Sequence, residues 1–318
     1  MRIGSRGSKL ALFQAEKVRD RLRNLFPEFS FEIEVIKTEG DQPPTGRGDS
    51  AAGRLILSDQ GVFTKAIDEA LQAERIDFAV HSAKDLPTQL LNSLEVGAVL
   101  ERDEVRDAWI SPAGVSLENL GKGAAVATGS PRRKAQTLRL RPDLNIVEIR
   151  GNVPTRLKKV REGLADGLIL AACGLIRLGL EGEITEILEK GKMFPAVGQG
   201  AIVVEIKKGH EIAVGMAQAL NHEESFLRVE AERSLLRALR GGCQVPVGAL
   251  SNVNGTRLIL EAAIFSPDGK DFVSGRIEGD GKDAVKLGKT LAERLKGEGG
   301  ARILEEIRKS DPIQIQDH

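Results

Sequence analysis

Short apolar stretches alternate with amphipathic segments over the first hundred residues. Apolar runs or strict alternation predict strands over 2–5, 31–35 and 77–82. A helix is expected from about Ser8 and another over 62–73, because apolar positions there recur at helical spacing. The apolar face of the first helix consists of Ala11, Ala15, Val18, Leu22 and Leu25. Such alternation predicts a largely parallel sheet with helices on both faces.

A second block repeats this pattern, and a hinge separates it from the next strand. The strands expected in the block cover 124–128, 145–149 and 167–171, and the helices cover 131–141 and 153–163. The stretch 194–200 has one Pro and two Gly, which favours a hinge before a strand over 201–206. A helix over 222–240 ends at two glycines.

The pattern changes after Cys243. Asn254-Gly255 and Asp268-Gly269 each lie between alternating runs, which is the signature of β-hairpins. Helical segments over 282–296 and 300–309 follow. Antiparallel strands followed by helices predict a separate small α+β domain.

Composition narrows the class of protein. The 318 residues are 41% hydrophobic and 29% charged, with 46 basic and 46 acidic residues. The hydrophobic and charged fractions indicate a folded rather than a disordered protein. The balanced charge and the low aromatic content of 3% argue against a nucleic-acid-binding protein. No apolar run is long enough for a membrane span, and the N-terminus lacks the apolar stretch of a signal peptide. Two cysteines suit a reducing compartment, so we expect a cytoplasmic protein.

Basic residues cluster between Thr128 and Arg161. This stretch holds ten Lys or Arg residues and only two acidic ones. Ser130 and Asn152 are each placed to cap a helix that follows a strand, so free N–H groups and arginines meet at strand ends. Carboxylate or polyanion binding is the interpretation we favour for Arg132, Arg133, Arg150 and Arg156, whereas a solvated helix face remains the competing interpretation.

Two further features can carry chemistry. Lys84 and Asp85 follow a buried strand, which suits general acid–base catalysis, although such a pair is more often a surface salt bridge. His81 fits a structural histidine equally well. Cys243 lies in a Gly-Gly-Cys loop and is a candidate nucleophile or attachment point, whereas Cys173 lies in an apolar stretch typical of a buried thiol. The chain has no zinc spacing, dinucleotide fingerprint or phosphate loop.

Nine motifs, in the same order along the chain, resemble the porphobilinogen deaminase family over essentially the whole length. They include Phe78-Ala79-Val80-His81-Ser82-Ala83-Lys84-Asp85, Gly129-Ser130-Pro131-Arg132-Arg133, Arg150-Gly151-Asn152, Pro195-Ala196-Val197-Gly198-Gln199-Gly200 and Gly241-Gly242-Cys243. Each motif is weak alone, but their order is specific.

The resemblance implies an α/β fold with two lobes like those of periplasmic binding proteins, each a mixed, mostly parallel sheet with helices on both faces, and a small α+β C-terminal domain. The implied domains are 1–100 with 200–219, then 105–195, and then 222–318. It implies that Cys243 carries a dipyrromethane cofactor through a thioether. It also implies that four porphobilinogen molecules are condensed with loss of ammonia, that hydroxymethylbilane is released, and that the protein is a monomer.

The resemblance also implies roles for individual residues. Asp85, with Lys84, serves catalysis and contacts the cofactor, since a carboxylate is needed beside the pyrrole nitrogens. The cofactor's carboxylates contact Thr128, Ser130, Arg132 and Arg133. The remaining residues implied to bind substrate are Arg6, Ser8, Phe63, Arg150, Arg156, Arg177 and Gln199.

The chain departs from the family pattern at two positions, and different functions stay possible. Gln60 stands where the family commonly has a lysine, and Ser5 replaces a threonine, which leaves the role of the loop 41–60 open. A non-enzymatic binding protein for an anionic metabolite would explain the arginines but not Asp85 or Cys243. An RNA-binding module and an inactive member of the family also stay open at this point.

Overall fold

The structure is a computed structural model that describes residues 1–38, 64–240 and 245–310. The chain divides into two compact units. Within the described residues, the first unit comprises Met1–Arg102 and Ala201–Val229, and the second comprises Asp103–Gly200 and 230–310. Each unit contains a five-stranded sheet, and a three-stranded sheet lies in the second unit.

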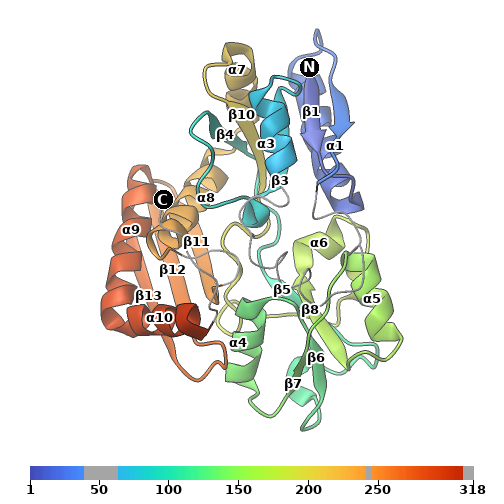
Figure 1. Cartoon of the computed structure of the whole chain (residues 1–318), viewed down its shortest axis with the longest axis vertical. Helices are drawn as coiled ribbons and strands as arrows, with labels where there is room; N and C mark the ends of the chain where they lie inside the picture. Colours follow the sequence, from blue (N-terminus) through green and yellow to red (C-terminus); the bar gives the residue numbers. More distant parts are fainter. Residues whose placement is uncertain (39–63, 241–244, 311–318) are drawn as a thin grey trace. The chain divides into compact units, whose positions relative to one another are not determined.

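The first unit is a five-stranded sheet covered by helices (Figure 1). Its strand order is β2-β1-β3-β10-β4. The strands are β1 (Arg2–Ser5), β2 (Glu32–Val35), β3 (Phe78–Ser82), β4 (Leu94–Val99) and β10 (Ile202–Lys207). β1 pairs in parallel with β2 and β3, whereas β10 runs antiparallel to both of its neighbours. The sheet is therefore mixed, because a strand from late in the sequence is inserted between β3 and β4.

Helices cover both faces of this sheet, as the hydrophobic pattern predicts. The helices are α1 (Lys9–Leu25), α3 (Lys65–Gln72), α7 (Glu211–Leu220) and the start of α8 (Glu223–Ala238). α1 and α7 share an apolar core with strand residues such as Val80 and Val204. α3 packs on residues such as Ala79 in a second core. Leu25, expected on the apolar face of the first helix, is 49% exposed because it is the last residue of α1. Val35, the last residue of β2, is 50% exposed for the same reason.

The five-stranded sheet of the second unit has the order β7-β6-β8-β5-β9. Its strands are β5 (Asp107–Ile110), β6 (Ala125–Ala127), β7 (Asn145–Val147), β8 (Gly167–Ala171) and β9 (Glu186–Ile187). Again the first three strands in this order are parallel and the fourth is antiparallel. The helices are α4 (Pro131–Leu140), α5 (Val153–Arg161) and α6 (Ala172–Ile176).

The C-terminal part forms the predicted hairpins. β11 (Val247–Asn254), β12 (Arg257–Phe265) and β13 (Phe272–Asp280) make an antiparallel sheet. α9 (Ala284–Leu295) packs on β12 and β13, and α10 (Ala301–Ser310) follows it. The mixed α/β fold class is confirmed, whereas the domain boundaries expected from the resemblance stay a prediction. Among the described residues, no helix is long and apolar enough to cross a bilayer.

Candidate functional site

Four predicted site residues lie at one edge of the first sheet. β1 and β3 are neighbouring parallel strands, so their carboxyl ends meet at the same edge. Arg6 and Ser8 follow β1, and Lys84 and Asp85 follow β3. The Ser8 hydroxyl accepts a hydrogen bond from Ala11 N at 3.2 Å and so caps α1. The carboxyl ends of parallel strands are where α/β folds bind ligands.

The turn that carries Lys84 and Asp85 is held by its flanking residues. Ala83–Asp85 form a single 3₁₀ turn directly after β3. Ala83 N donates to Ala201 O at 3.0 Å. The Gln14 amide donates to the Ser82 hydroxyl at 2.8 Å, which ties α1 to the end of β3. Asp85 is exposed beside the half-buried Lys84. A held, accessible carboxylate of this kind can exchange protons with a ligand.

In the second unit, three parallel strands likewise end at a common edge. β6 leads through Thr128 to Ser130, whose hydroxyl accepts from Arg133 N and caps α4. β7 is followed by Arg150 and then by Asn152, whose side chain accepts from Thr155 N at 2.9 Å and caps α5. Both predicted caps are confirmed. The Thr128 hydroxyl accepts from Ser130 N at 3.2 Å, which shapes the turn before α4.

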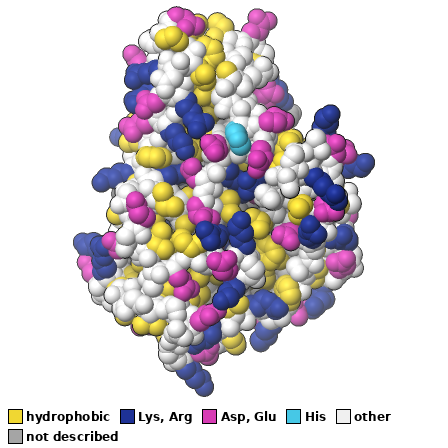
Figure 2. Space-filling model, turned by 180° about the vertical axis from the view of Figure 1, so that it is seen from behind, with side chains coloured by type: hydrophobic (Ala, Val, Ile, Leu, Met, Phe, Trp, Pro, Cys, Tyr) yellow, Lys and Arg dark blue, Asp and Glu magenta, His cyan; other side chains and the backbone are white. Residues whose placement is uncertain are grey.

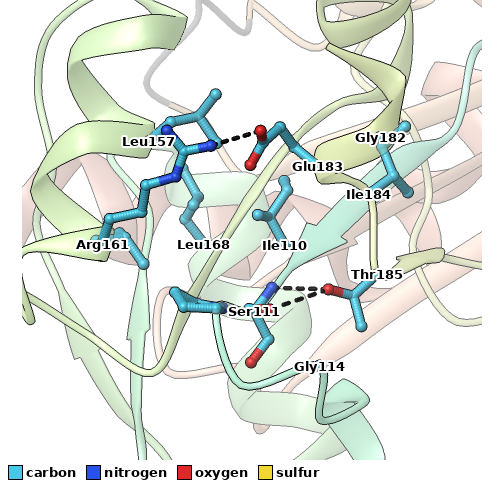
Figure 3. Close-up of a pocket in the computed structure, with 12 residues that line it drawn as sticks. Ile110, Ser111, Gly114, Leu157, Arg161, Leu168, Gly182, Glu183, Ile184 and Thr185 are labelled. Atoms are coloured by element: carbon cyan, nitrogen blue, oxygen red, sulfur yellow. Dashed lines mark hydrogen bonds and ion pairs between the residues drawn. The ribbon is translucent and has the colours of Figure 1, made fainter.

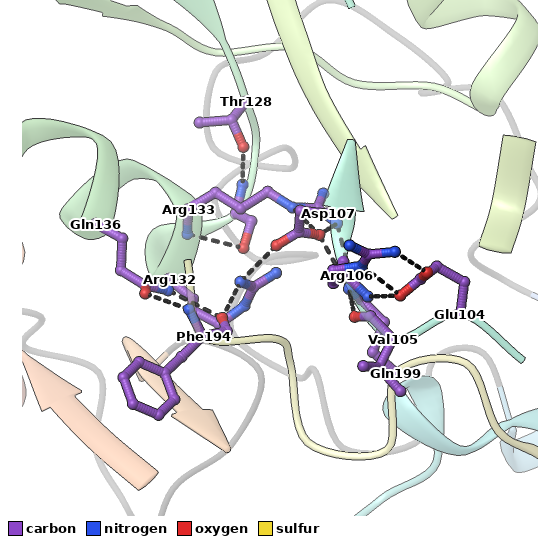
Figure 4. Close-up of polar contacts among 11 residues, drawn as sticks. Glu104, Val105, Arg106, Asp107, Thr128, Arg132, Arg133, Gln136, Phe194 and Gln199 are labelled. Atoms are coloured by element: carbon purple, nitrogen blue, oxygen red, sulfur yellow. Dashed lines mark hydrogen bonds and ion pairs between the residues drawn. The ribbon is translucent and has the colours of Figure 1, made fainter. Parts of the chain in front are cut away.

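Asp107 brings together three of the predicted ligand-binding side chains (Figure 4). Its carboxylate, 0% exposed, accepts from Arg132 Nη1 at 2.7 Å and from Arg133 Nη2 at 2.8 Å. It also accepts from Arg133 Nε at 3.1 Å and from Gln199 Nε2 at 3.0 Å. Arg132 further donates to Phe194 O at 2.5 Å. Arg132, Arg133 and Gln199 therefore form one buried network.

The opposite charges of Asp107 and the two arginines offset the cost of burying this network. Burial alone would raise the pKa of Asp107, but the guanidinium groups of Arg132 and Arg133 outweigh it and hold that pKa well below its usual range. Two guanidinium groups against one carboxylate leave a net positive charge beside the start of α4. The positive end of the α4 dipole adds to it.

The other predicted arginines have different surroundings. Arg150 is exposed and contacts Glu148, with Nη2 2.7 Å from the carboxylate oxygen Oε1. Arg156 Nε donates to Gly151 O at 2.6 Å. Arg177 is buried, follows α6, and donates to Asp103 Oδ2 at 2.8 Å and to Gly200 O at 2.7 Å. Arg150 is thus placed to meet a ligand from solvent, whereas Arg177 supports the backbone of the predicted hinge.

A cavity of about 520 Å³ lies elsewhere in the second unit (Figure 3). Its walls come from the end of β5, from α5 and from the segment 182–185. Arg161 and Glu183 form an ion pair beside it, and Ser111 N donates to Thr185 Oγ1 at 2.9 Å. None of the predicted site residues that the structure describes lines this cavity, so its size alone does not connect it with the chemistry.

On the face drawn in Figure 2, acidic and basic side chains are intermixed. This agrees with the equal numbers of acidic and basic residues. The basic residues between Thr128 and Arg161 are also partly neutralised within the protein, as Arg132, Arg141 and Arg161 each contact a carboxylate.

Asp107 is the residue that sequence reasoning missed as part of the site. It occurs in the Arg106-Asp107-Ala108-Trp109 motif, where an acidic residue begins an otherwise apolar buried strand. The charge of Asp107 at the start of an apolar strand is the sequence feature from which its role could have been inferred. Phe63, Cys243, Gln60 and the loop 41–60 lie outside the described residues, so their predicted roles stay predictions.

Comparison with known proteins covers nearly the whole chain. A family model described as "Porphobilinogen deaminase, dipyromethane cofactor binding domain" matches residues 1–214, and the model of the C-terminal domain of the same enzyme matches 226–297. Porphobilinogen deaminase from Thermus thermophilus is 46% identical over 96% of this chain and 98% of its own length. The protein of that name from Desulforamulus reducens is 44% identical over 97% and 98%.

Among solved structures, a TRAP periplasmic solute-binding protein from Ralstonia eutropha matches with a TM-score of 0.41 and 12% identity, over 98% of each chain. A likeness this distant says nothing about ligand or activity. The two family models and the near full-length relatives are decisive. The chain belongs to the porphobilinogen deaminase family of transferases.

Proposed function

We propose that this chain joins four porphobilinogen molecules head to tail, with loss of ammonia, onto a dipyrromethane bound to Cys243 by a thioether. Hydrolysis then releases hydroxymethylbilane. The observation that carries this proposal is the match of both family models, which together span residues 1–214 and 226–297. A solute-binding function would not explain the exposed Asp85 or the Gly-Gly-Cys loop.

The second unit has donors that fit a cofactor bearing carboxylates. Arg132 Nε is buried and has no hydrogen-bond partner among the described residues, which leaves one donor of this network unused. The net positive charge of Arg132 and Arg133 favours a carboxylate over a neutral group. Thr128 and Ser130 add hydroxyl groups at the same strand end. We propose that these four residues hold the dipyrromethane.

When bound, the dipyrromethane supplies the pyrrole carbon to which the first substrate molecule is joined. The chain's own residues orient the reactants and move protons. Asp85 places a negative charge where the substrate becomes cationic on losing ammonia, and its carboxylate accepts and returns a proton. Lys84, adjacent on the same turn, offers a hydrogen-bond donor to cofactor or substrate.

Substrate carboxylates are the proposed ligands of the other predicted residues. Each pyrrole ring carries an acetate and a propionate, which need paired donors when they leave water. Arg6, Ser8, Arg150 and Arg156 lie at the carboxyl edges of the two sheets and are proposed to contact them directly. Arg177, Gln199 and Phe63 complete the proposed set. Arg177 and Gln199 already form hydrogen bonds within the second unit, so we propose that they both bind substrate and hold the surrounding backbone and side chains in place.

We also propose that the protein acts as a monomer in the cytoplasm. Cys173, a free thiol, is buried and needs no partner in a reducing compartment.

Intact mass spectrometry tests the proposed attachment. The purified protein should weigh more than its sequence by two pyrrole units, and brief exposure to porphobilinogen should add further substrate increments. Cys243→Ala should remove all of this mass, whereas Cys173→Ala, a matched change at a buried thiol, should keep it. A bare mass for the active protein, or the added mass persisting in Cys243→Ala, would refute the attachment.

The role of Asp85 is tested by Asp85→Asn, which preserves shape and removes the charge. Turnover should fall by at least ~10²-fold, as expected for a proton-transferring group. Asp20→Asn, at an exposed acid of α1 in the same unit, should leave turnover unchanged. Near-normal turnover in folded Asp85→Asn would remove this residue from the mechanism without affecting the test of Cys243.

A further inference from the structure

Three ionisable side chains that the proposed reaction does not use meet beneath α3. They are Asp68 of α3, His81 of β3 and Glu205 of β10. Each offers one ligand atom, and these atoms all lie within 4.8 Å of one another. The cluster lies entirely in the first unit.

Strand register places two of these side chains on one face of the sheet. His81 pairs with Val203 and Ala79 with Glu205 across β3 and β10, so His81 and Glu205 are diagonal neighbours on the same face. α3 covers that face through an apolar core that includes Ile67 and Ala79. Asp68 follows Ile67, and its carboxylate reaches the two strand residues.

Each of the three side chains has at least one buried polar atom without a hydrogen-bond partner among the described residues. Glu205 is 1% exposed and His81 is 6% exposed. Among the described residues, both Glu205 oxygens, His81 Nε2 and Asp68 Oδ1 lack a hydrogen-bond partner. His81 Nε2 lies 3.5 Å from Glu205 Oε2. The ligand atoms of the three side chains thus face one another within 4.8 Å, while the atoms named above form no hydrogen bonds among the described residues.

Two ionised carboxylates that are buried side by side require a positive charge nearby to offset their desolvation and mutual repulsion. Burying an ionised carboxylate without a partner costs several kcal/mol or more. Burial first, and then the charge of Glu205, raise the pKa of Asp68, while His81 offsets part of this effect. With the imidazole neutral and both carboxylates ionised, as metal ligands must be, the three side chains would carry a charge of −2, which one divalent cation would balance.

We propose that Asp68, His81 and Glu205 bind one divalent transition-metal ion of the Mn²⁺ or Zn²⁺ type. One imidazole nitrogen and two carboxylate oxygens are ligands that such ions accept. Metal–ligand bonds of about 2.1 Å put ligand atoms about 3–4 Å apart, so shifts of less than ~1 Å would close the site. Asp68 is half-buried, which leaves a side for water ligands and for access. The bound ion would link α3 to β3 and β10 through these three ligands.

Manganese titration of the full-length protein tests this site independently of catalysis. The protein is freed of metal with a chelator, and Mn²⁺ alone is added while the electron paramagnetic resonance signal of the free ion is followed. We expect one equivalent to bind and the midpoint of thermal unfolding to rise, because the ion binds only the folded state. Zn²⁺ should compete for the same equivalent.

Variants assign the ion to the cluster. Asp68→Asn and His81→Gln should each weaken Mn²⁺ binding at least tenfold. His210→Gln removes a histidine outside the cluster, whose Nε2 lies 3.5 Å from Asp77 Oδ1, and should leave binding unchanged. Circular dichroism checks folding, and the half-buried Asp68 variant decides the matter if His81→Gln misfolds. The proposal would be overturned if the wild type bound no equivalent of Mn²⁺, or if folded Asp68→Asn bound Mn²⁺ as tightly as the wild type. Protons would then neutralise the buried carboxylates.

Discussion

Replacing Asp107 with Asn removes the negative charge on which two buried guanidinium groups depend. The side chains of Arg132 and Arg133 are 5% and 8% exposed, and no other carboxylate among the described residues forms an ion pair with either. Asn preserves the size of the side chain, so the change tests charge and hydrogen bonding rather than a cavity.

The structure sets the scale of the effect. Removing one partner of a buried ion pair costs about 3–5 kcal/mol, because the remaining charge is left uncompensated. Asp107 accepts from both arginines and from Gln199, so the upper part of that range, about 4–5 kcal/mol, applies. At about 2–4 °C per kcal/mol for a unit of this size, the unfolding midpoint should fall by roughly 8–20 °C.

Scanning calorimetry of the wild type and Asp107→Asn measures this difference. Asp143→Asn is the matched control, since Asp143 accepts from Arg141 at 2.8 and 2.7 Å but has a side chain that is 27% exposed, against 0% for Asp107. It should change the midpoint little. Adding Arg133→Gln to Asp107→Asn should recover part of the loss, because one of the two unpaired charges is removed. A destabilisation below about 1 kcal/mol for Asp107→Asn would refute the charge argument.

Two further predictions concern the same unit. Because the pKa of Asp107 is lowered in the folded state, its contribution is complete above the ordinary carboxyl value of about 4 and is lost as the pH falls below it. In urea titrations, the difference in unfolding free energy between wild type and Asp107→Asn should be constant from pH 7 to 5 and shrink below about pH 4, and a difference that grows in acid would contradict this. Gly167→Ala would place a Cβ 2.3 Å from the Trp109 ring and should cost about 1–3 kcal/mol. Gly191→Ala, whose Cβ meets nothing within 4 Å, should change the unfolding free energy by less than about 0.5 kcal/mol, and equal effects of the two changes would exclude overpacking as the cause.

Local features of the chain could be predicted from sequence because their energetics are local. Ser130 and Asn152 cap helices as expected, since each side chain reaches an N–H only three residues ahead. The hairpins at Asn254-Gly255 and Asp268-Gly269 form for the same reason. Strand boundaries were less accurate, as β7 ends at Val147 rather than at residue 149.

Which charges meet could not be predicted, because that depends on strand order. Asp107 lies 25 residues from Arg132 and 92 from Gln199, and the insertion of β10 beside β3 brings Glu205 to His81. Local patterns along the chain were enough to predict most of the helices, the two hairpins, the family and the candidate residues. That Arg132 and Arg133 share a buried carboxylate could be seen only in the folded chain, because burial and pairing of charge arise from contacts between distant segments.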